Sequence, residues 1–170
     1  MSKFFKAAAA ALFLCLLLAS PIYAQESNLA AKINQHRLQQ SLPPLTQSQL
    51  LKRSAHNRAC DIKQTGSFSH TDSNGQGFQF WIKKTGYDFV YAGENLAKNF
   101  TSDEQLLAAW IDSPSHQKIL LSEKYTEIGI GRCGQYVVAH FGRKRASAWR
   151  ALTEIISTLL AGAKYRLLQA

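Results

Sequence analysis

Two histidines and one carboxylate stand in small-residue turns in the middle of this chain: His70, Glu94 and His116. Neutral imidazoles bind borderline metals such as zinc, and imidazole and carboxylate groups also transfer protons. A carboxylate beside an imidazole either completes a metal shell or orients the ring by accepting its N–H. These residue types fit a polar cleft in which both histidines bind a divalent metal weakly and Glu94 orients a ring. Residue types alone favour the alternative, in which the histidines only hydrogen-bond backbone groups and fix their turns.

The elements that position these residues are predicted from the spacing of apolar side chains. Helical spacing predicts helices over 28–40, 46–66 and 78–86, and a capping box at 101–104 opens a fourth. Alternation of apolar and polar side chains then predicts two strands, 126–132 and 135–141, which form a hairpin around Cys133-Gly134. A further strand is predicted near 89–92. Helices that precede and flank a small, mainly antiparallel sheet predict an α+β domain ending near Gly142.

The first 24 residues have the pattern of a secretory signal peptide. Lys3 and Lys6 precede an apolar run over 7–19, and Ala24 is a small residue suited to cleavage. We expect the mature domain to begin at Gln25 and the protein to be exported, to the periplasm or the medium. A retained anchor is the alternative.

Export changes how the cysteines are interpreted. Cys15 leaves with the signal peptide, so the mature chain keeps Cys60 and Cys133 in an oxidising compartment. We predict a disulfide between them, with two buried free thiols as the alternative. Neither lies in a Cys-x-x-Cys spacing, which argues against a redox or zinc-finger role.

The positive charge is unevenly distributed. The formal net charge is +9, but residues 25–142 carry 12 basic and 10 acidic residues, a difference of +2. Residues 143–170 carry six basic residues and one acid, a difference of +5. Because the domain shows no basic face interleaved with aromatics, no nucleic-acid partner is expected.

Several short strings along residues 28 to 142 follow the order of a known family. They are Phe68-Ser69-His70-Thr71, Gly86-Tyr87, 92–97 (AGENLA), Trp110 with Ser113, Pro114 and His116, 125–131 (YTEIGIG) and 136–142 (YVVAHFG). In these strings the chain resembles the CAP superfamily of cysteine-rich secretory, antigen 5 and pathogenesis-related 1 proteins, and its bacterial SCP-like extracellular branch. The resemblance implies a three-layer α-β-α sandwich, secretion and a central cleft with a polar tetrad.

Only three members of that tetrad carry over to this sequence. The two histidines fall on His70 and His116 and one glutamate on Glu94, but Ser113 stands where the second glutamate is expected. Asp112 and Asp72 are the carboxylates that could substitute for it. The residues expected to line the cleft are Ser69, Asp72, Asn95 and Ser113.

The histidines outside the cleft strings, His36, His56 and His140, are interpreted as solvated or structural. Arg58, inside the second predicted helix, is interpreted as a packing or capping residue.

Two functions of different classes fit this sequence. The first is a non-enzymatic binding module of the cell envelope or exterior, with a cleft for a lipid, a sterol-like compound or another envelope-derived ligand. The second is a weak metal-dependent, protease-like hydrolase with Glu94 as the catalytic base. No His-Glu-x-x-His or Gly-x-Ser-x-Gly motif is present, and the missing second glutamate favours the binding module.

The segment 143–170 is predicted to be a basic amphipathic helix. Its apolar side chains recur at helical spacing from Trp149 to Ala163, and basic residues lie at both ends. Such a helix combines apolar burial with attraction to anionic lipids, so the segment is a candidate for contact with a membrane surface. The alternatives are docking on the domain as an extra helix that covers the core and a frayed appendage beyond the domain.

Overall fold

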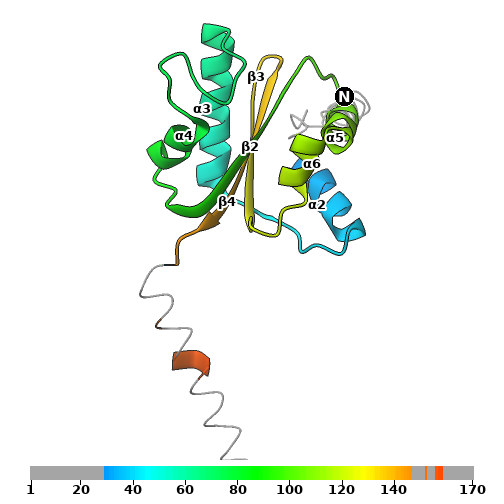
Figure 1. The fold of residues 1–170 in the computed structure, drawn as a ribbon, viewed down its shortest axis with the longest axis vertical. Helices are drawn as coiled ribbons and strands as arrows, with labels where there is room; N and C mark the ends of the chain where they lie inside the picture. The colour runs from blue at the N-terminus through cyan, green and yellow to red at the C-terminus, as the bar shows by residue number, and fades with distance from the viewer. Residues whose placement is uncertain (1–28, 147–151, 153–155, 159–170) are drawn as a thin grey trace, which may run out of the picture.

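A four-stranded sheet lies between two layers of helices in the computed structural model, which describes residues 29–146, 152 and 156–158 (Figure 1). The strands are β1 (Thr46–Gln47), β2 (Phe89–Lys98), β3 (Glu127–Cys133) and β4 (Tyr136–Lys144). Their order is β1-β3-β4-β2; β1 runs parallel to β3, and the other neighbours are antiparallel. The strands β1 and β2 therefore form the two edges of the sheet.

One helical layer contains α3 (Gln49–Thr65) and α4 (Phe78–Lys84). Two glycines of β3 let α3 lie unusually close to the sheet. A Cβ atom added at Gly129 would overlap the backbone at Leu51 and Lys52, and one at Gly131 would overlap the backbone at Ala55 and His56. Gly66, at φ 74°, ends α3 in the left-handed conformation that favours glycine.

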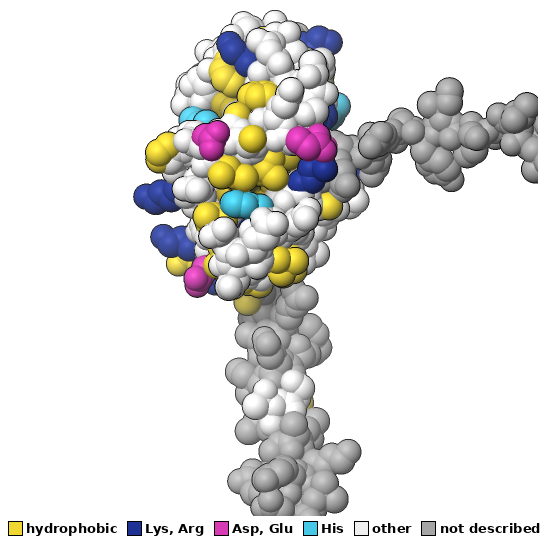
Figure 2. All heavy atoms as spheres, turned by 90° about the vertical axis from the view of Figure 1, so that its right-hand side faces the viewer, with side chains coloured by type: hydrophobic (Ala, Val, Ile, Leu, Met, Phe, Trp, Pro, Cys, Tyr) yellow, Lys and Arg dark blue, Asp and Glu magenta, His cyan; other side chains and the backbone are white. Residues whose placement is uncertain are grey.

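The other layer contains α2 (Leu29–Gln39), α5 (Asp103–Asp112) and α6 (Pro114–Leu120). Their apolar faces and the facing side of the sheet form the largest core cluster, which includes Trp110 and Phe141. The side chain of Ser102 caps α5 by accepting a hydrogen bond from the Gln105 amide, one residue later than the predicted cap. Figure 2 shows this side of the molecule, where hydrophobic side chains gather at the centre of the face among charged side chains.

The predicted α+β class and three-layer α-β-α arrangement are confirmed. The four predicted helices and the hairpin are present, and the hairpin turns at Gly134. The predicted start of the second helix at Thr46 is wrong, because residues 46–47 pair with β3 and the helix begins at Gln49. The strand predicted near 89–92 continues to Lys98, so Glu94 lies on a strand and not in a turn. The sequence patterns do not predict two short elements, β1 and α6. Two and seven residues are too few for a periodic pattern, and β1 exists because the Ser48 amide donates to the Ile128 carbonyl and the Thr46 amide to that of Thr126.

The final strand extends beyond the predicted end of the domain at Gly142. β4 continues to Lys144, and Arg143 donates to the Glu123 carbonyl, so the first basic residues of the predicted tail belong to the sheet. Of the rest of the tail, only residues 145, 146, 152 and 156–158 are described, and the last four are helical. The predicted signal peptide and most of the predicted amphipathic helix lie outside the described residues. Within the described part of the chain, no helix has the length and apolar character needed to cross a membrane.

The predicted disulfide is confirmed. Cys60 of α3 and Cys133 at the end of β3 are bonded, with their Cα atoms 5.0 Å apart and a sequence separation of 73. The bond ties the C-terminal half of α3 to the β3–β4 hairpin.

Replacing both Cys60 and Cys133 with serine is expected to lower the free energy of unfolding by about 4 kcal/mol, because the open chain regains the entropy of a 73-residue loop. Denaturant unfolding of the oxidised protein and of the variant measures the difference. Addition of dithiothreitol should destabilise the parent protein and leave the variant unchanged. Equal midpoints for the two oxidised samples would contradict the prediction.

Candidate functional site

The predicted cleft lies at the β2 edge of the sheet, where residues from both helical layers meet. Glu94 is on β2, directly opposite His140 of β4. His70 lies in the loop between α3 and α4, on one face of the sheet, and His116 is on α6, on the other. The two histidines therefore approach the edge strand from opposite sides.

Glu94 is the centre of a buried hydrogen-bond network. Its side chain is fully buried; Oε1 lies 2.8 Å from Nδ1 of His70 and Oε2 lies 3.0 Å from Nε2 of His140. His140 is itself fully buried, and its Nδ1 lies 2.9 Å from the hydroxyl oxygen of Ser54 on α3. With Glu94 ionised, both rings donate to the carboxylate, and the Ser54 hydroxyl forms a hydrogen bond with the other ring nitrogen of His140.

The charge state of this network follows from its geometry. Burial opposes ionisation of Glu94, but the hydrogen bonds and charges of His140 and His70 outweigh it, so the pKa of Glu94 lies below its usual value. The hydrogen bond to Glu94 raises the pKa of His70, against the opposing effects of partial burial and the nearby Arg58 charge. Because 58% of the His70 side chain is exposed, its ring connects the buried network to solvent.

The loop that carries His70 is held by residues on either side of it. Arg58, fully buried on α3, donates to the Ser69 carbonyl at 2.5 Å and pairs with Asp61. Asp72 is buried, and its Oδ1 accepts the amides of Asn74 and Gln76, each at 2.9 Å. Asp72 therefore closes the turn after His70 and does not contact the imidazole network. Arg58, interpreted above as a packing or capping residue, anchors this loop.

His116 is fixed by a second, separate set of contacts. Its Nδ1 lies 2.8 Å from the hydroxyl oxygen of Ser113, and its ring stacks on Trp110 with a centroid separation of 6.3 Å. The buried Asn95 side chain donates to the His116 carbonyl at 3.2 Å. Burial lowers the pKa of His116, and the positive charge of nearby His70 lowers it further. His116 is therefore the ring that stays neutral to lower pH.

An apolar pocket of about 240 Å³ adjoins His116. It lies along the second half of β2, between that strand and α5. Its lining residues are Phe68, Leu96, Ala97, Lys98, Phe100, Ala109, Trp110, Ser113 and His116. The Trp110 indole donates to the Leu96 carbonyl at 3.1 Å and so fixes the wall between strand and helix. The pocket combines an apolar interior with an imidazole at its rim.

The structure brings several of the predicted residues together and separates others. His70 and Glu94 are bonded; His116, Ser113 and Asn95 form the neighbouring cluster; and Ser69 contributes its backbone to the Arg58 anchor. Asp112 is exposed at the end of α5, and Asp72 is engaged in its turn. Neither carboxylate replaces the missing glutamate in the network.

His140 is the site residue that sequence reasoning missed. Of the two interpretations given above, solvated or structural, the first is wrong, because the side chain is fully buried and bonded to Glu94. The available signal was a histidine within the apolar run 136–141, whose neighbours on both sides are buried. A strand covered on both faces buries its polar residues too, and a buried imidazole needs a partner.

The arrangement limits how a metal would be held. Among the described residues, neither His70 nor His116 has a hydrogen-bond partner at Nε2, so both nitrogens are available as ligands. No group of three or more histidine, cysteine, aspartate or glutamate side chains is placed to hold a metal within the described part of the chain. The described residues therefore do not form a closed structural zinc site.

Comparison with known proteins assigns this three-layer fold to a family. The model of the CAP family, described as the Cysteine-rich secretory protein family, matches residues 30–141, and the chain belongs to this family. The family resemblance in its sequence strings is thereby confirmed.

Individual relatives come from bacteria. An uncharacterized protein, YkwD, of Bacillus subtilis is 33% identical over 66% of this chain and 44% of its own length. An uncharacterized membrane protein, YlbC, of the same organism is 28% identical over 68% of this chain and 34% of its own. The chain thus spans less than half the length of these two curated relatives.

Solved structures share the fold. An extracellular protein containing an SCP domain from Bacillus anthracis superimposes with a TM-score of 0.67 at 27% identity, over 69% of this chain and 39% of that protein. An outer surface protein of Borrelia burgdorferi gives a TM-score of 0.65 at 24% identity, over 69% and 90% of the two chains. The extracellular relative is consistent with the predicted export.

Glu94→Gln tests the buried network. The folded pKa of Glu94 lies below its unfolded value, so the carboxylate stabilises the fold above about pH 4.5, and this contribution is lost as pH falls through the folded pKa. The variant is expected to lose about 2–3 kcal/mol of unfolding free energy at pH 7. Its stability should then fall less than that of the parent protein as the pH is lowered.

Thermal unfolding measured from pH 7 to pH 3 provides the comparison. Asp112→Asn, at an exposed aspartate, is the matched control and should follow the parent protein. Identical acid profiles for Glu94→Gln and the parent would contradict the assigned role of the carboxylate.

Proposed function

We propose that this chain is a non-enzymatic binding module of the cell envelope or exterior, whose cleft holds an apolar, envelope-derived ligand and weakly binds a divalent metal. The observations that carry the proposal are an apolar pocket of about 240 Å³ and the oriented imidazole of His116 in its lining; His70 follows two residues after Phe68, another lining residue. A ligand with an apolar part and a polar head matches both features.

The walls of the pocket support an apolar occupant. Phe68, Leu96, Phe100 and Trp110 contribute apolar surface, and the ammonium of Lys98 lies 4.8 Å from the centroid of the Phe68 ring. Lys98 and His116 can receive an anionic or hydrogen-bonding head at the rim. Lipids and sterol-like compounds have this combination of apolar body and polar end.

The geometry gives the hydrolase alternative less support. Both carboxylate oxygens of Glu94 are occupied by imidazoles, and the side chain is fully buried. A general base must reach the water that it deprotonates, and Glu94 instead orients His70. A screen of peptide and ester substrates that found activity, with that activity lost in Glu94→Gln, would overturn the non-enzymatic proposal.

Filling the pocket should remove the ligand. Ala109, half-buried, lines the pocket, whereas its neighbour Ala108 is exposed on α5. Protein purified from its native host is expected to release a lipid-like compound on organic extraction, detected by mass spectrometry. Ala109→Phe should reduce the recovered amount about tenfold, and Ala108→Phe should leave it unchanged. Equal recovery from both variants, or none from the parent, would argue against the pocket as the ligand site.

Metal binding should depend on pH through His70. A metal requires neutral imidazole, and the pKa of His70 is raised, so affinity is expected to increase as pH rises through that value. Zinc titration followed by calorimetry between pH 5.5 and 8 measures this affinity. Zinc is expected to bind more tightly to the parent protein than to His70→Ala. His56→Ala, at an exposed histidine of α3, is the control. Equal zinc binding by the parent and His70→Ala would rule out the metal site.

A further inference from the structure

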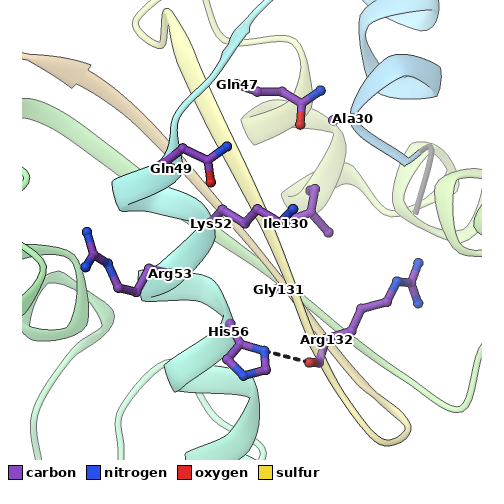
Figure 3. A pocket seen from close by; sticks show the side chains of 9 residues that line it. All are labelled: Ala30, Gln47, Gln49, Lys52, Arg53, His56, Ile130, Gly131 and Arg132. Atoms are coloured by element: carbon purple, nitrogen blue, oxygen red, sulfur yellow. Dashed lines mark hydrogen bonds between the residues drawn. The ribbon is translucent and has the colours of Figure 1, made fainter. Parts of the chain in front are cut away.

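A second hollow lies at the opposite edge of the sheet from the histidine cleft. Its volume is about 560 Å³, and it runs between α3 and the start of α2, with β3 as its floor (Figure 3). The lining residues are Ala30, Gln47, Gln49, Lys52, Arg53, His56, Ile130, Gly131 and Arg132. We call this hollow the edge groove.

The floor of the edge groove is an incompletely paired strand. Pairing of β1 with β3 covers only Thr46 with Glu127 and Gln47 with Ile128. Beyond Ile128, β3 has β4 on one side and the edge groove on the other, among the described residues. Successive residues of a strand direct their backbone groups to alternate sides, so every second residue of β3 faces the groove.

Two hydrogen bonds identify which residues face outward. The Ile128 carbonyl accepts the Ser48 amide at 2.8 Å, and the Arg132 carbonyl accepts Nδ1–H of His56 at 2.9 Å. Ile130 lies between them and directs its N–H and C=O to the same side. No described residue outside the sheet bonds to these two backbone groups. They form the start of a ladder for an added strand.

The side chains around this open backbone are cationic. Lys52 and Arg53 are exposed on α3, and Arg132 enters from β3 with its guanidinium held by Asp103 at the margin. Among the described lining residues there is no aspartate or glutamate. Gly131 adds no side chain to the floor, because the backbone of α3 packs directly against it. The charge of the lining favours an acidic occupant, and the open backbone of Ile130 favours an extended one.

We propose that the edge groove binds an extended acidic peptide segment of a partner protein, which adds a strand to β3 beside Ile130. Main-chain hydrogen bonds to Ile130 give the affinity, and the positive charge of the lining favours acidic side chains on the partner. The partner's strand continues the line of β1 and ends where the His56 ring covers the Arg132 carbonyl. A peptide fits better than a nucleic acid because Ile130 offers one backbone N–H and one backbone C=O side by side, which match the C=O and N–H of another peptide backbone.

Fluorescence anisotropy with a labelled eight-residue peptide, glutamate alternating with valine or threonine, tests the proposal on the purified protein. Saturable binding that weakens with added salt is expected. The same peptide with lysine in place of glutamate should bind at least tenfold more weakly. A version N-methylated at alternate residues should also lose at least tenfold, because it cannot complete the ladder. On binding, the Ile130 amide should gain protection from hydrogen exchange.

A matched pair of variants separates the edge groove from general charge. Lys52→Glu with Arg53→Glu should weaken binding at least tenfold, whereas Lys83→Glu with Lys84→Glu, on exposed positions of α4, should change it little. Equal binding of the acidic and basic peptides, full binding of the methylated peptide, or no binding at all would overturn the proposal. Binding seen only after residues 25–28 are deleted would also overturn it, since the occupant would then be the chain's own segment.

Discussion

The buried carboxylate of Glu94 is the contact on which the cleft depends. Its two oxygens form hydrogen bonds with His140 of β4 and with His70 in the loop after α3, so the carboxylate links β2 to both. Ser54 of α3 bonds to His140 and extends the network into that helix. A buried charge of this kind is costly unless every oxygen is paired. The orientation of the exposed His70 ring is therefore set by residues that never reach solvent.

Much of the architecture could be predicted from this sequence, and the reasons for the failures are physical. Long helices and the hairpin carry periodic apolar patterns. The disulfide could be predicted because removal of the predicted signal peptide leaves only two cysteines. The site was predicted in part. His70, Glu94 and His116 stand in recognisable sequence strings, although only His70 lies in a loop. His140 enters through cross-strand register with Glu94, and register between strand residues 46 positions apart cannot be predicted from local periodicity.

The two edges of the sheet differ in the side chains and strands that cover them. At the β2 edge, side chains from α5 and α6 and from the loop after α3 surround the strand and create a pocket rich in aromatic and imidazole groups. At the β3 edge, a two-residue strand covers only part of the backbone, and cationic side chains stand over the remainder. Natural sheets protect open edges with charge, and the same charge can select a partner.

The disulfide between Cys60 and Cys133 links the far end of α3 to the hairpin that ends β3. These are the two elements that form the walls and floor of the edge groove. Such a bond forms in oxidising compartments and is reduced in the cytosol. The disulfide therefore fixes the spacing between α3 and β3 only under oxidising conditions, which makes the shape of the groove sensitive to the redox state of its surroundings.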